Sequence, residues 1–498
     1  MQLYNEKDVE LVNEKIDSIT DIIDHKKLEI FEPTKKELMD ANAIVMQFIK
    51  DKKRKVYGGY AQNKAIINKD PKDAFYKEDD IPDIDVYSPE PIKDLIDLCN
   101  ILKQKGFKRV QGKEAEHKET YKVFANDANV CDLSYVPKNI YYKIPFIEIE
   151  GIQYTHPSFV YIDFYRMLTD PYFSSFRWKK IFPRLYKLQK HYPINKATKG
   201  LNEGYDIPKT KQQEVKNIND FILNEIKGKG DYIVVGQYAY NYFLKQSGIL
   251  DNKDLSRKYK LIDIPFMQII STNYIPDASK IIIKLKEKFS KITFTEFYPF
   301  WMFTGYNVVV YYDETPIIHI TSHNRRCVPT LKTKDNIQIG CFDYVFLMNL
   351  ISTFRAKVNN VEDKYHYHNI MTSHLIEMRN YYLKKNKLTL LDKSPFMSFI
   401  PDCTGPTMDP MRENRLIRDK KFKEGKLVIF RYNPDEPRTP PEYKFSNTSG
   451  NEIRKPINLK LTKYINNPKL LAEFELEQTE RVDLISEDTE NTEEASEE

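Results

Sequence analysis

The stretch Ile81-Pro82-Asp83-Ile84-Asp85-Val86-Tyr87 decides the fold, together with Val56-Tyr57-Gly58-Gly59 upstream. In a β-strand, residues two apart point to the same face, so Asp83 and Asp85 would emerge on one side, roughly 7 Å apart at Cα. Ile84 and Val86 would point the other way, into a core. Two carboxylates on one strand face repel each other and resist burial, and a divalent cation relieves both costs. The pair therefore predicts a strand that binds metal.

The glycine pair Gly58-Gly59 follows a short strand at Val56-Tyr57. Such a turn offers bare backbone N–H groups to a phosphate. Either a lone glycine pair or a lone Asp-x-Asp is a weak signal. Together they predict metal-dependent chemistry on a nucleoside triphosphate.

A third carboxylate comes from a predicted hairpin over residues 121–134, in which Asn126-Asp127 forms the turn. Its second arm is largely apolar and is interrupted by Asp132. A lone aspartate there is more often a strand-end or hydrogen-bonded residue than a ligand. Beside the earlier pair, we expect Asp132 to be the third carboxylate, offered from a neighbouring strand.

Nucleotidyl transfer needs few protein groups beyond such a cluster. Two metal ions about 3.5–4 Å apart activate the attacking 3′-hydroxyl and support the leaving pyrophosphate, and Mg²⁺ prefers oxygen ligands. We predict that Asp83 and Asp85 hold both ions and that Asp132 holds the ion beside the hydroxyl. Gly58 and Gly59 would hold the triphosphate through their N–H groups.

Four short stretches of the chain recur in the same order, at offsets of 178 to 185 residues. They pair residues 57–63 with 235–241, 81–85 with 264–268, 129–132 with 307–310, and 151–154 with 336–339. Ordered matches predict a duplicated fold, although a chance likeness between generic strand–helix–strand elements is the alternative. In this pairing Phe266, Gln268 and Val310 stand where Asp83, Asp85 and Asp132 stood. The second copy manages without the aspartates, which argues that the three serve chemistry.

Composition places the chain among globular proteins, with 41% hydrophobic and 30% charged residues. The first residues are too polar for a signal peptide, and no apolar run approaches the ~20 residues of a membrane span. The five cysteines are scattered without a Cys-x-x-Cys pair, which predicts a reducing compartment and neither a structural zinc nor a disulfide framework.

Charge is distributed unevenly along the chain. Residues 473–498 carry twelve acidic residues and one basic residue, so the net charge of +5 leaves +16 on the rest. A basic body suits a polyanion such as nucleic acid, although a lysine-rich bias that merely solubilises the surface is an equal alternative. The acidic tail is expected to be disordered, and it could compete with RNA for the basic surface.

Weaker candidates lie outside the aspartate cluster. Arg177 and Lys179, beside Lys180, could reach the triphosphate or RNA, but a solvated helix face explains them equally well. A tyrosine series could include a base-stacking residue, although core packing suits most of its members better: Tyr154, Tyr161, Tyr165 and Tyr172. A histidine cluster at 366, 368 and 374 lacks zinc-finger spacing.

The motifs resemble those of the DNA polymerase β-like nucleotidyltransferases, and within them the poly(A) polymerase catalytic subunits of poxviruses, African swine fever-type viruses and mimivirus-type viruses. The matching stretches cover residues 56–59, 83–88, 130–137 and 156–166. One departure is the long segment 60–82 between the glycines and the first aspartate, where many relatives keep about ten residues; this weakens the assignment of Gly58 and Gly59.

The resemblance implies an α+β fold with a polymerase β-like catalytic domain, a degenerate second nucleotidyltransferase-like domain and a helical N-terminal region. The segments we expect are an N-terminal helical region (1–55), a catalytic domain with its following helices (56–192), a linker (193–230), a degenerate domain (231–400), a basic proline-punctuated extension (401–472) and an acidic disordered tail (473–498).

The implied activity is template-independent addition of AMP from ATP to mRNA 3′ ends, with two Mg²⁺ or Mn²⁺ ions held by Asp83, Asp85 and Asp132. The resemblance implies action in the host cytoplasm, in a viral factory, with the virion as a second location. The mimivirus-type resemblance favours a homodimer, and the poxvirus one a heterodimer with a processivity subunit; neither implies a membrane.

Two other functions stay open at this point. One is a nucleotidyltransferase with another product: poly(U), CCA or oligoadenylate. The other is an RNA-binding scaffold that retains a decayed enzyme fold, and the intact aspartate set counts against it. Mg²⁺-dependent ATP binding separates the enzymes from the scaffold.

Overall fold

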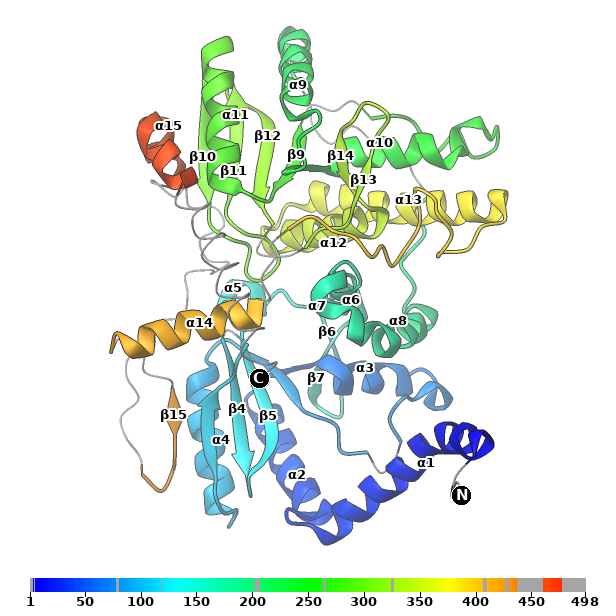
Figure 1. Ribbon diagram of the computed structural model, residues 1–498, viewed down its shortest axis with the longest axis vertical. Helices are drawn as coiled ribbons and strands as arrows, with labels where there is room; N and C mark the ends of the chain where they lie inside the picture. Colours follow the sequence, from blue (N-terminus) through cyan, green and yellow to red (C-terminus); the bar gives the residue numbers. More distant parts are fainter. Residues whose placement is uncertain are drawn as a thin grey trace. The chain divides into compact units, whose positions relative to one another are not determined.

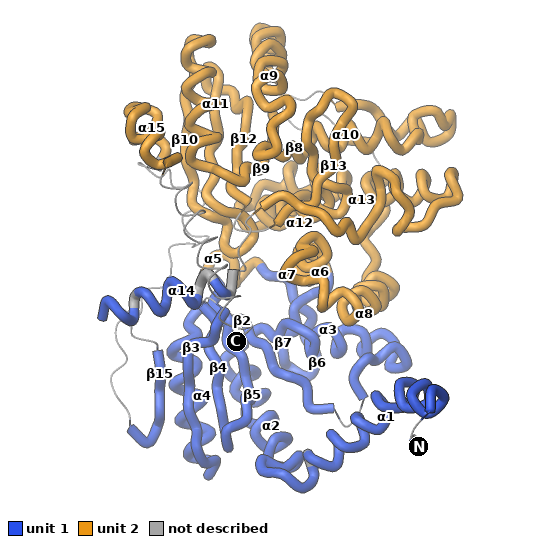
Figure 2. The backbone as a smooth tube through the Cα atoms, viewed as in Figure 1, with its two compact units in different colours: residues 1–136, 144–157, 411–445 blue, residues 137–143, 158–410, 446–498 orange. Residues whose placement is uncertain are grey.

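The structure, a computed structural model, describes residues 3, 5–77, 80–117, 119–198, 200–201, 207–262, 266–323, 327–405, 410–425, 430–436 and 460–476. The chain forms two compact units (Figure 2). Unit 1 contains residues 1–136, 144–157 and 411–445, and unit 2 contains residues 137–143, 158–410 and 446–498. Each unit is built on its own mixed β-sheet, with helices around it (Figure 1).

Unit 1 contains an eight-stranded sheet in the order β15-β3-β4-β5-β2-β1-β7-β6. Its strands are β1 (Lys55–Tyr57), β2 (Asp85–Ser88), β3 (Gln111–Glu114), β4 (Thr120–Ala125), β5 (Ala128–Tyr135), β6 (Phe146–Ile149), β7 (Ile152–Thr155) and β15 (Arg431–Tyr432). Its helices are α1 (Glu6–Ile30), α2 (Lys35–Asp51), α3 (Gly58–Ile67), η1 (Pro71–Asp73), α4 (Pro91–Gln104) and α14 (Pro410–Lys423).

Two amphipathic helices, α2 and α4, pack on this sheet. A capping box starts α2, in which Thr34 N donates to Glu37 Oε2 at 2.8 Å and Thr34 Oγ1 accepts from Glu37 N at 3.4 Å. The apolar faces of both helices are buried against the strands, with Ala41, Val45, Phe48, Ile49, Leu95, Leu98 and Leu102 in one core with Val56, Val86 and Leu133. This core fixes the strands that bear the predicted site.

The predicted hairpin is confirmed as β4 and β5. Asn126 and Asp127 both have positive φ, 50° and 66°, as a two-residue type I′ turn requires. A β-bulge between Val123 and Phe124 shifts the register of the pair, so that Lys122 lies opposite Asp132.

Unit 2 contains a seven-stranded sheet in the order β10-β11-β12-β9-β8-β14-β13. Its strands are β8 (Tyr232–Val235), β9 (Met267–Ser271), β10 (Ile292–Phe297), β11 (Asn307–Tyr312), β12 (Thr315–Ser322), β13 (Thr330–Lys332) and β14 (Gln338–Gly340). Its helices are α5 (Lys138–Tyr141), α6 (Pro157–Leu168), α7 (Pro171–Ser174), η2 (Ser175–Arg177), α8 (Trp178–His191), η3 (Lys209–Lys211), α9 (Gln212–Ile226), α10 (Gly236–Ser247), η4 (Ile249–Asp251), α11 (Tyr274–Lys288), α12 (Phe342–Val358), α13 (Glu362–Asn386) and α15 (Lys460–Ile465).

The two sheets share one topology. Apart from the extra edge strand β15, the order β3-β4-β5-β2-β1-β7-β6 in unit 1 matches β10-β11-β12-β9-β8-β14-β13 in unit 2. A local motif recurs with it. Ser88 Oγ donates to Asp94 as Ser271 Oγ donates to Asp277, at 2.6 Å in the second case. The predicted duplication is therefore confirmed.

One stretch of the predicted repeat was aligned wrongly. Asp132 lies on β5, whose counterpart is β12, whereas Val310 lies on β11, the counterpart of β4. In register, Asp85 faces Asp132 and Gln268 faces His319. The counterpart of Asp132 is therefore His319, and the likeness between residues 129–132 and 307–310 joined two different strands of a hairpin. Residues 264 and 265 of the second stretch lie outside the described part.

The units divide the chain differently from the predicted segments. Residues 158–192, expected to complete the catalytic domain, belong to unit 2. The predicted linker 193–230 contains α9, whose Val215, Ile218 and Ile222 are buried at helical spacing, so residues 212–226 of it form a packed helix. The predicted extension 401–472 contributes β15 to unit 1 and α15 to unit 2.

The prediction of no disulfide was wrong for one pair. Cys327 and Cys403 are bonded, with their Cα atoms 5.4 Å apart, because the bridge between Val328 and Thr404 pairs the two segments. A sequence separation of 76 residues hides such a pair from spacing arguments. Cys99, Cys131 and Cys341 are free and buried.

Two other expectations concern the ends and the membrane. Beyond Leu476 the predicted acidic tail lies outside the described residues. Of the helices that the structure describes, none combines the length and the apolar character that crossing a bilayer requires.

Candidate active site

Two of the three predicted carboxylates lie on adjacent parallel strands at the centre of the unit 1 sheet. Asp85 starts β2 and is the register partner of Asp132 on β5, and Asp132 N donates to Ile84 O at 2.9 Å. The strands hold their positions because Ile84, Val86 and Leu133 are buried on the opposite face. The sheet therefore presents both carboxylates side by side.

Asp83 precedes β2 and is exposed. Its charge, with that of Asp132, acts on Asp85, so the three carboxylates form one electrostatic cluster. We predicted that Asp83 and Asp85 lie on one strand, but β2 begins at Asp85, so Asp83 lies outside it. Pro82 has no N–H to donate to a neighbouring strand, which disfavours a longer strand here.

Gly58 lies directly against this cluster. It has a φ of +70°, and a Cβ built on it would overlap the Asp85 carboxylate. Only glycine satisfies both the backbone conformation and the close approach. The long segment 60–82 had weakened the assignment of the glycines. It contains most of α3 and all of η1, and Gly58 nevertheless lies beside Asp85.

The N-terminus of α3 begins at this glycine. Tyr57 is the N-cap, and its side chain donates or accepts no capping bond there; its hydroxyl hydrogen-bonds Ser134 Oγ at 2.8 Å instead. The first N–H groups of α3, Gly59 among them, are therefore available to an anion, and the helix dipole favours one.

Asp132 has two partners that the sequence did not reveal. Lys122 Nζ donates to Asp132 Oδ2 at 2.6 Å, and Asn129 Nδ2 donates to Asp132 Oδ1 at 2.8 Å. Lys122 reaches it because of the bulge in β4–β5, which turn counting from Asn126-Asp127 does not predict. An ammonium group thus offsets part of the negative charge of the cluster.

The remaining negative charge is visible in the pKa of Asp85, which is raised from 3.8 to about 7. Burial is the largest cause, followed by the charges of Asp132 and Asp83, and Lys122 opposes them. A carboxylate this hard to ionise needs a further cation to be fully charged at neutral pH.

The oxygen atoms of the cluster suit a hard divalent cation. Besides three carboxylates, Asn129 Oδ1 is buried and has no hydrogen-bond partner among the described residues. Asp83 and Asn129 also line a cleft of about 390 Å³ with residues of α1 and α2, whereas Asp85 and Asp132 do not line it. All-oxygen sites beside open space are typical of Mg²⁺ or Mn²⁺.

The corresponding place in unit 2 keeps the scaffold and lacks the acids. A Cβ on Gly236, with a φ of +64°, would overlap Gln268 as one on Gly58 would overlap Asp85. His319 is half-buried beside Gln268, its Nε2 bonds Asn307 Oδ1 at 2.9 Å, and Phe266 stacks on it. Burial lowers the pKa of His319 to about 3, so His319 is neutral at neutral pH; like Gln268, it supplies no negative charge to this place.

Arg177 and Lys179, the other predicted triphosphate ligands, are exposed on η2 and α8 of unit 2. They belong to a different unit from Gly58, and their role stays a prediction. The histidines are structural instead: Asn349 bonds His368 at 2.8 Å, and Tyr240 bonds His374 at 2.9 Å.

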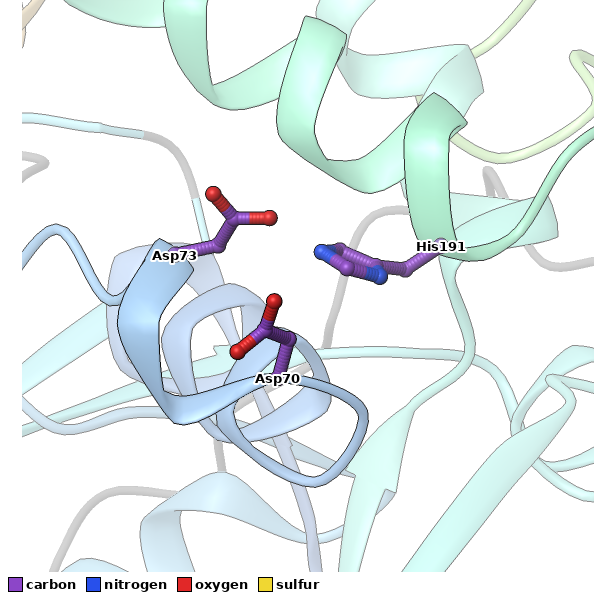
Figure 3. Close-up of side chains that lie close together, drawn as sticks. All are labelled: Asp70, Asp73 and His191. Atoms are coloured by element: carbon purple, nitrogen blue, oxygen red, sulfur yellow. The ribbon is translucent and has the colours of Figure 1, made fainter.

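A second pair of carboxylates lies on η1 (Figure 3). Oxygens of Asp70 and Asp73 lie within 4.8 Å of each other. Asp70 Oδ1 accepts from Lys72 N at 3.0 Å, so its place follows from capping the turn. His191, drawn in the same figure, belongs to unit 2.

Two family models match the chain. One describes the poly(A) polymerase catalytic subunit and matches residues 43–174, which include all three aspartates and both glycines. The other describes the C-terminal part of the mimivirus poly(A) polymerase catalytic subunit and matches residues 188–463.

Relatives of this chain agree with these models. A protein of Acanthamoeba polyphaga mimivirus named as a poly(A) polymerase catalytic subunit is 35% identical over 96% of this chain and 87% of its own length. A counterpart in African swine fever virus is 34% identical over 32% of this chain and 34% of its own length. The crystal structure of the Megavirus polyadenylate synthase superposes with a TM-score of 0.85 at 35% identity, covering 92% of this chain and 94% of that one.

Proposed function

The chain belongs to the viral poly(A) polymerase catalytic subunits, and we propose on that premise that it extends RNA 3′ ends with AMP from ATP at the cluster of Asp83, Asp85 and Asp132 in unit 1. It is a template-independent polynucleotide adenylyltransferase. The finer points proposed here are the site, its metal ions, the partners and the compartment.

One observation carries the site assignment. Asp85 and Asp132 are register partners on neighbouring strands, with the Gly58 turn against them, and the same scaffold in unit 2 has Gln268 and His319 there. A fold that keeps the strands and the turn in both copies does not need the acids for stability. Their presence in unit 1 alone supports a chemical role.

Divalent ions bound by the three carboxylates would activate the RNA 3′-hydroxyl and neutralise charge on the triphosphate and pyrophosphate. Asp83 and Asp85 would hold these ions, and Asp132 would hold the one that activates the RNA 3′-hydroxyl. The free N–H groups at the start of α3 hold the triphosphate, since they point at an anion without needing a side chain. Lys122 keeps Asp132 in place at 2.6 Å before substrate arrives.

A nucleotide panel tests this function. A labelled short RNA is incubated with the full chain, Mg²⁺ or Mn²⁺, and each of the four nucleoside triphosphates alone. Long products with ATP alone support polyadenylation. Extension with another nucleotide would keep the chemistry and replace the product, and no Mg²⁺-dependent ATP binding would support the scaffold alternative.

We propose that a second copy of the chain is its partner, because α1 exposes an apolar seam. Residues at heptad spacing line it, and each is more than 40% exposed: Val9, Val12, Ile16, Ile19, Ile23 and Ile30. A seam of this spacing is what a facing helix with the same pattern packs against. The alternative occupant is a processivity subunit.

The oligomeric state tests that seam. Sedimentation of the full chain should give a dimer, which Ile16→Lys with Ile19→Lys should dissociate. The matched control, Asn13→Lys, adds a charge on another face of α1. A monomeric parent chain would contradict self-association and favour a heteromeric partner.

We also propose that the enzyme acts in the host cytoplasm. The proposal rests on the relatives, which are proteins of mimivirus and African swine fever virus, because the Cys327–Cys403 bond does not itself indicate a reducing compartment. Fractionation of infected cells tests this; enzyme confined to the nucleus would contradict it.

A further inference from the structure

Unit 2 contains a cavity of about 180 Å³ whose walls combine aromatic, leucine and polar side chains. Tyr165 of α6, Phe182 and Tyr186 of α8, and Phe399 line it. Tyr186 is 65% exposed and Phe182 is 39% exposed, so the cavity opens to solvent on the side of α8. Typical sites for drug-sized ligands measure roughly 300–1,000 Å³, so this one has room for a single ring system.

The inner end of the cavity is polar. Asp343 of α12 lies there, 7% exposed, with Arg379 of α13 and Ser398. Arg379 donates one N–H to Ser398 Oγ at 3.2 Å, while its Nε is buried and has no hydrogen-bond partner among the described residues. A carboxylate acceptor and a guanidinium donor thus face one small space, with one donor unsatisfied. Unsatisfied buried donors are costly, which indicates a ligand.

The helix that forms the cavity mouth is strongly basic. The sequence of α8 is WKKIFPRLYKLQKH, and Lys179, Lys180 and Lys190 on it are exposed. Phe182 and Tyr186 are four residues apart and therefore share a face of the helix. Basic residues interleaved with exposed aromatics are the usual surface for single-stranded nucleic acid.

We propose that this cavity binds one base of the single-stranded RNA, an adenine of the growing tail, while the lysines of α8 contact the flanking phosphates. The inference rests on the proposed function, since the product of that reaction is a run of adenosines. It adds a binding site in unit 2, the unit that has no acidic cluster of its own among the described residues of its sheet.

Adenine matches the groups in the cavity. Its exocyclic amino group donates, as Asp343 requires, and its ring nitrogens accept, as Arg379 Nε requires. Its face stacks on Tyr186 or Phe182, at the mouth, where a base can enter from solvent. Uracil can also donate its ring N–H to Asp343, but the two carbonyl oxygens that flank this N–H are repelled by the carboxylate, so the cavity favours adenine.

Binding of RNA to the full chain without metal or ATP tests the proposal. The probes are labelled oligo(A), labelled oligo(U) and an abasic strand of equal length, followed by fluorescence anisotropy. Tyr186→Ala should weaken oligo(A) binding about tenfold, within the range for one stacked base, and leave the abasic strand unchanged. Phe176→Ala is the matched control, because Phe176 is a 76% exposed aromatic nearby that does not line the cavity.

A second variant tests the polar end of the cavity. Asp343→Asn keeps the shape, and it should reduce the preference for oligo(A) over oligo(U). Equal losses for Tyr186→Ala and Phe176→Ala, an equal loss on the abasic strand, or an unchanged preference in Asp343→Asn would overturn the proposal. Asp85→Asn is assayed separately by primer extension, which reports on the catalytic cluster, whereas metal-free binding of oligo(A) reports on the cavity, so failure of the two assignments gives different results.

Discussion

Asp85→Asn should stabilise the metal-free protein, and increasingly so as pH rises. The pKa of Asp85 is raised from 3.8 to about 7, chiefly by burial. A group with a raised folded pKa binds its proton more tightly in the folded state, so the free energy of unfolding falls as pH rises from about 4 to about 7 and is level above. Asparagine has no charge to bury and avoids this loss.

The size of the effect follows from the shift. About three pKa units correspond to roughly 4 kcal/mol at pH 8, an upper limit because the site relaxes. At pH 5 only the part between about 4 and 5 has been lost, so the gain from Asp85→Asn should be about 2–3 kcal/mol larger at pH 8 than at pH 5.

Urea unfolding with EDTA at both pH values measures this difference. Gln268→Asn, at the equivalent place in unit 2, changes no charge and is the matched control. Mg²⁺ at a hundred times its dissociation constant should then add about 2.7 kcal/mol to the parent chain and much less to Asp85→Asn. A gain that is the same at pH 5 and pH 8 would refute the electrostatic account of the cluster.

Three further changes have defined outcomes. Gly58→Ala should lose about 1–2 kcal/mol of stability and nearly all activity, because its Cβ would displace Asp85. Gly236→Ala should lose stability alone, and melting and primer-extension assays of both variants make the comparison. Lys122→Met should destabilise the metal-free protein by about 1 kcal/mol, because the ion pair with Asp132 is lost. It should also lower the Mg²⁺ concentration needed for half-maximal stabilisation, because the ammonium group no longer competes for Asp132; a metal titration of the melting temperature measures this. Truncation after Leu476 should strengthen RNA binding at low salt if the acidic tail competes with RNA, and unchanged affinity would exclude that competition. This cut keeps the ion pair of Glu475 with Lys280.

The sequence predicted the aspartates, the hairpin and the duplicated fold because each leaves a local pattern. The alternation of Asp83 and Asp85 with Ile84 and Val86 marks the strand at Asp85, and Asn126-Asp127 marks the turn. The register between β4 and β5 was not predicted, because a bulge alters it. The bulge between Val123 and Phe124 brings Lys122 opposite Asp132, and no sequence pattern there indicates an extra residue in the hairpin.

Long-range pairings also escaped prediction. His319 was missed as the counterpart of Asp132 because the alignment by likeness chose the wrong strand of a hairpin. The Cys327–Cys403 bond and the return of β15 to the unit 1 sheet join residues far apart in the chain. Such contacts follow from topology, which local composition does not encode.

The most direct test of the central claim compares equivalent positions in the two units. Primer extension with ATP and Mg²⁺ is measured for the parent chain, for Asp85→Ala and for Gln268→Ala. The duplicated fold with a single functional acid cluster predicts that Asp85→Ala loses extension by a factor of at least about 1,000, while Gln268→Ala extends RNA like the parent chain. Extension that survives Asp85→Ala, or that is lost in Gln268→Ala as fully as in Asp85→Ala, would contradict the assignment of the chemistry to unit 1.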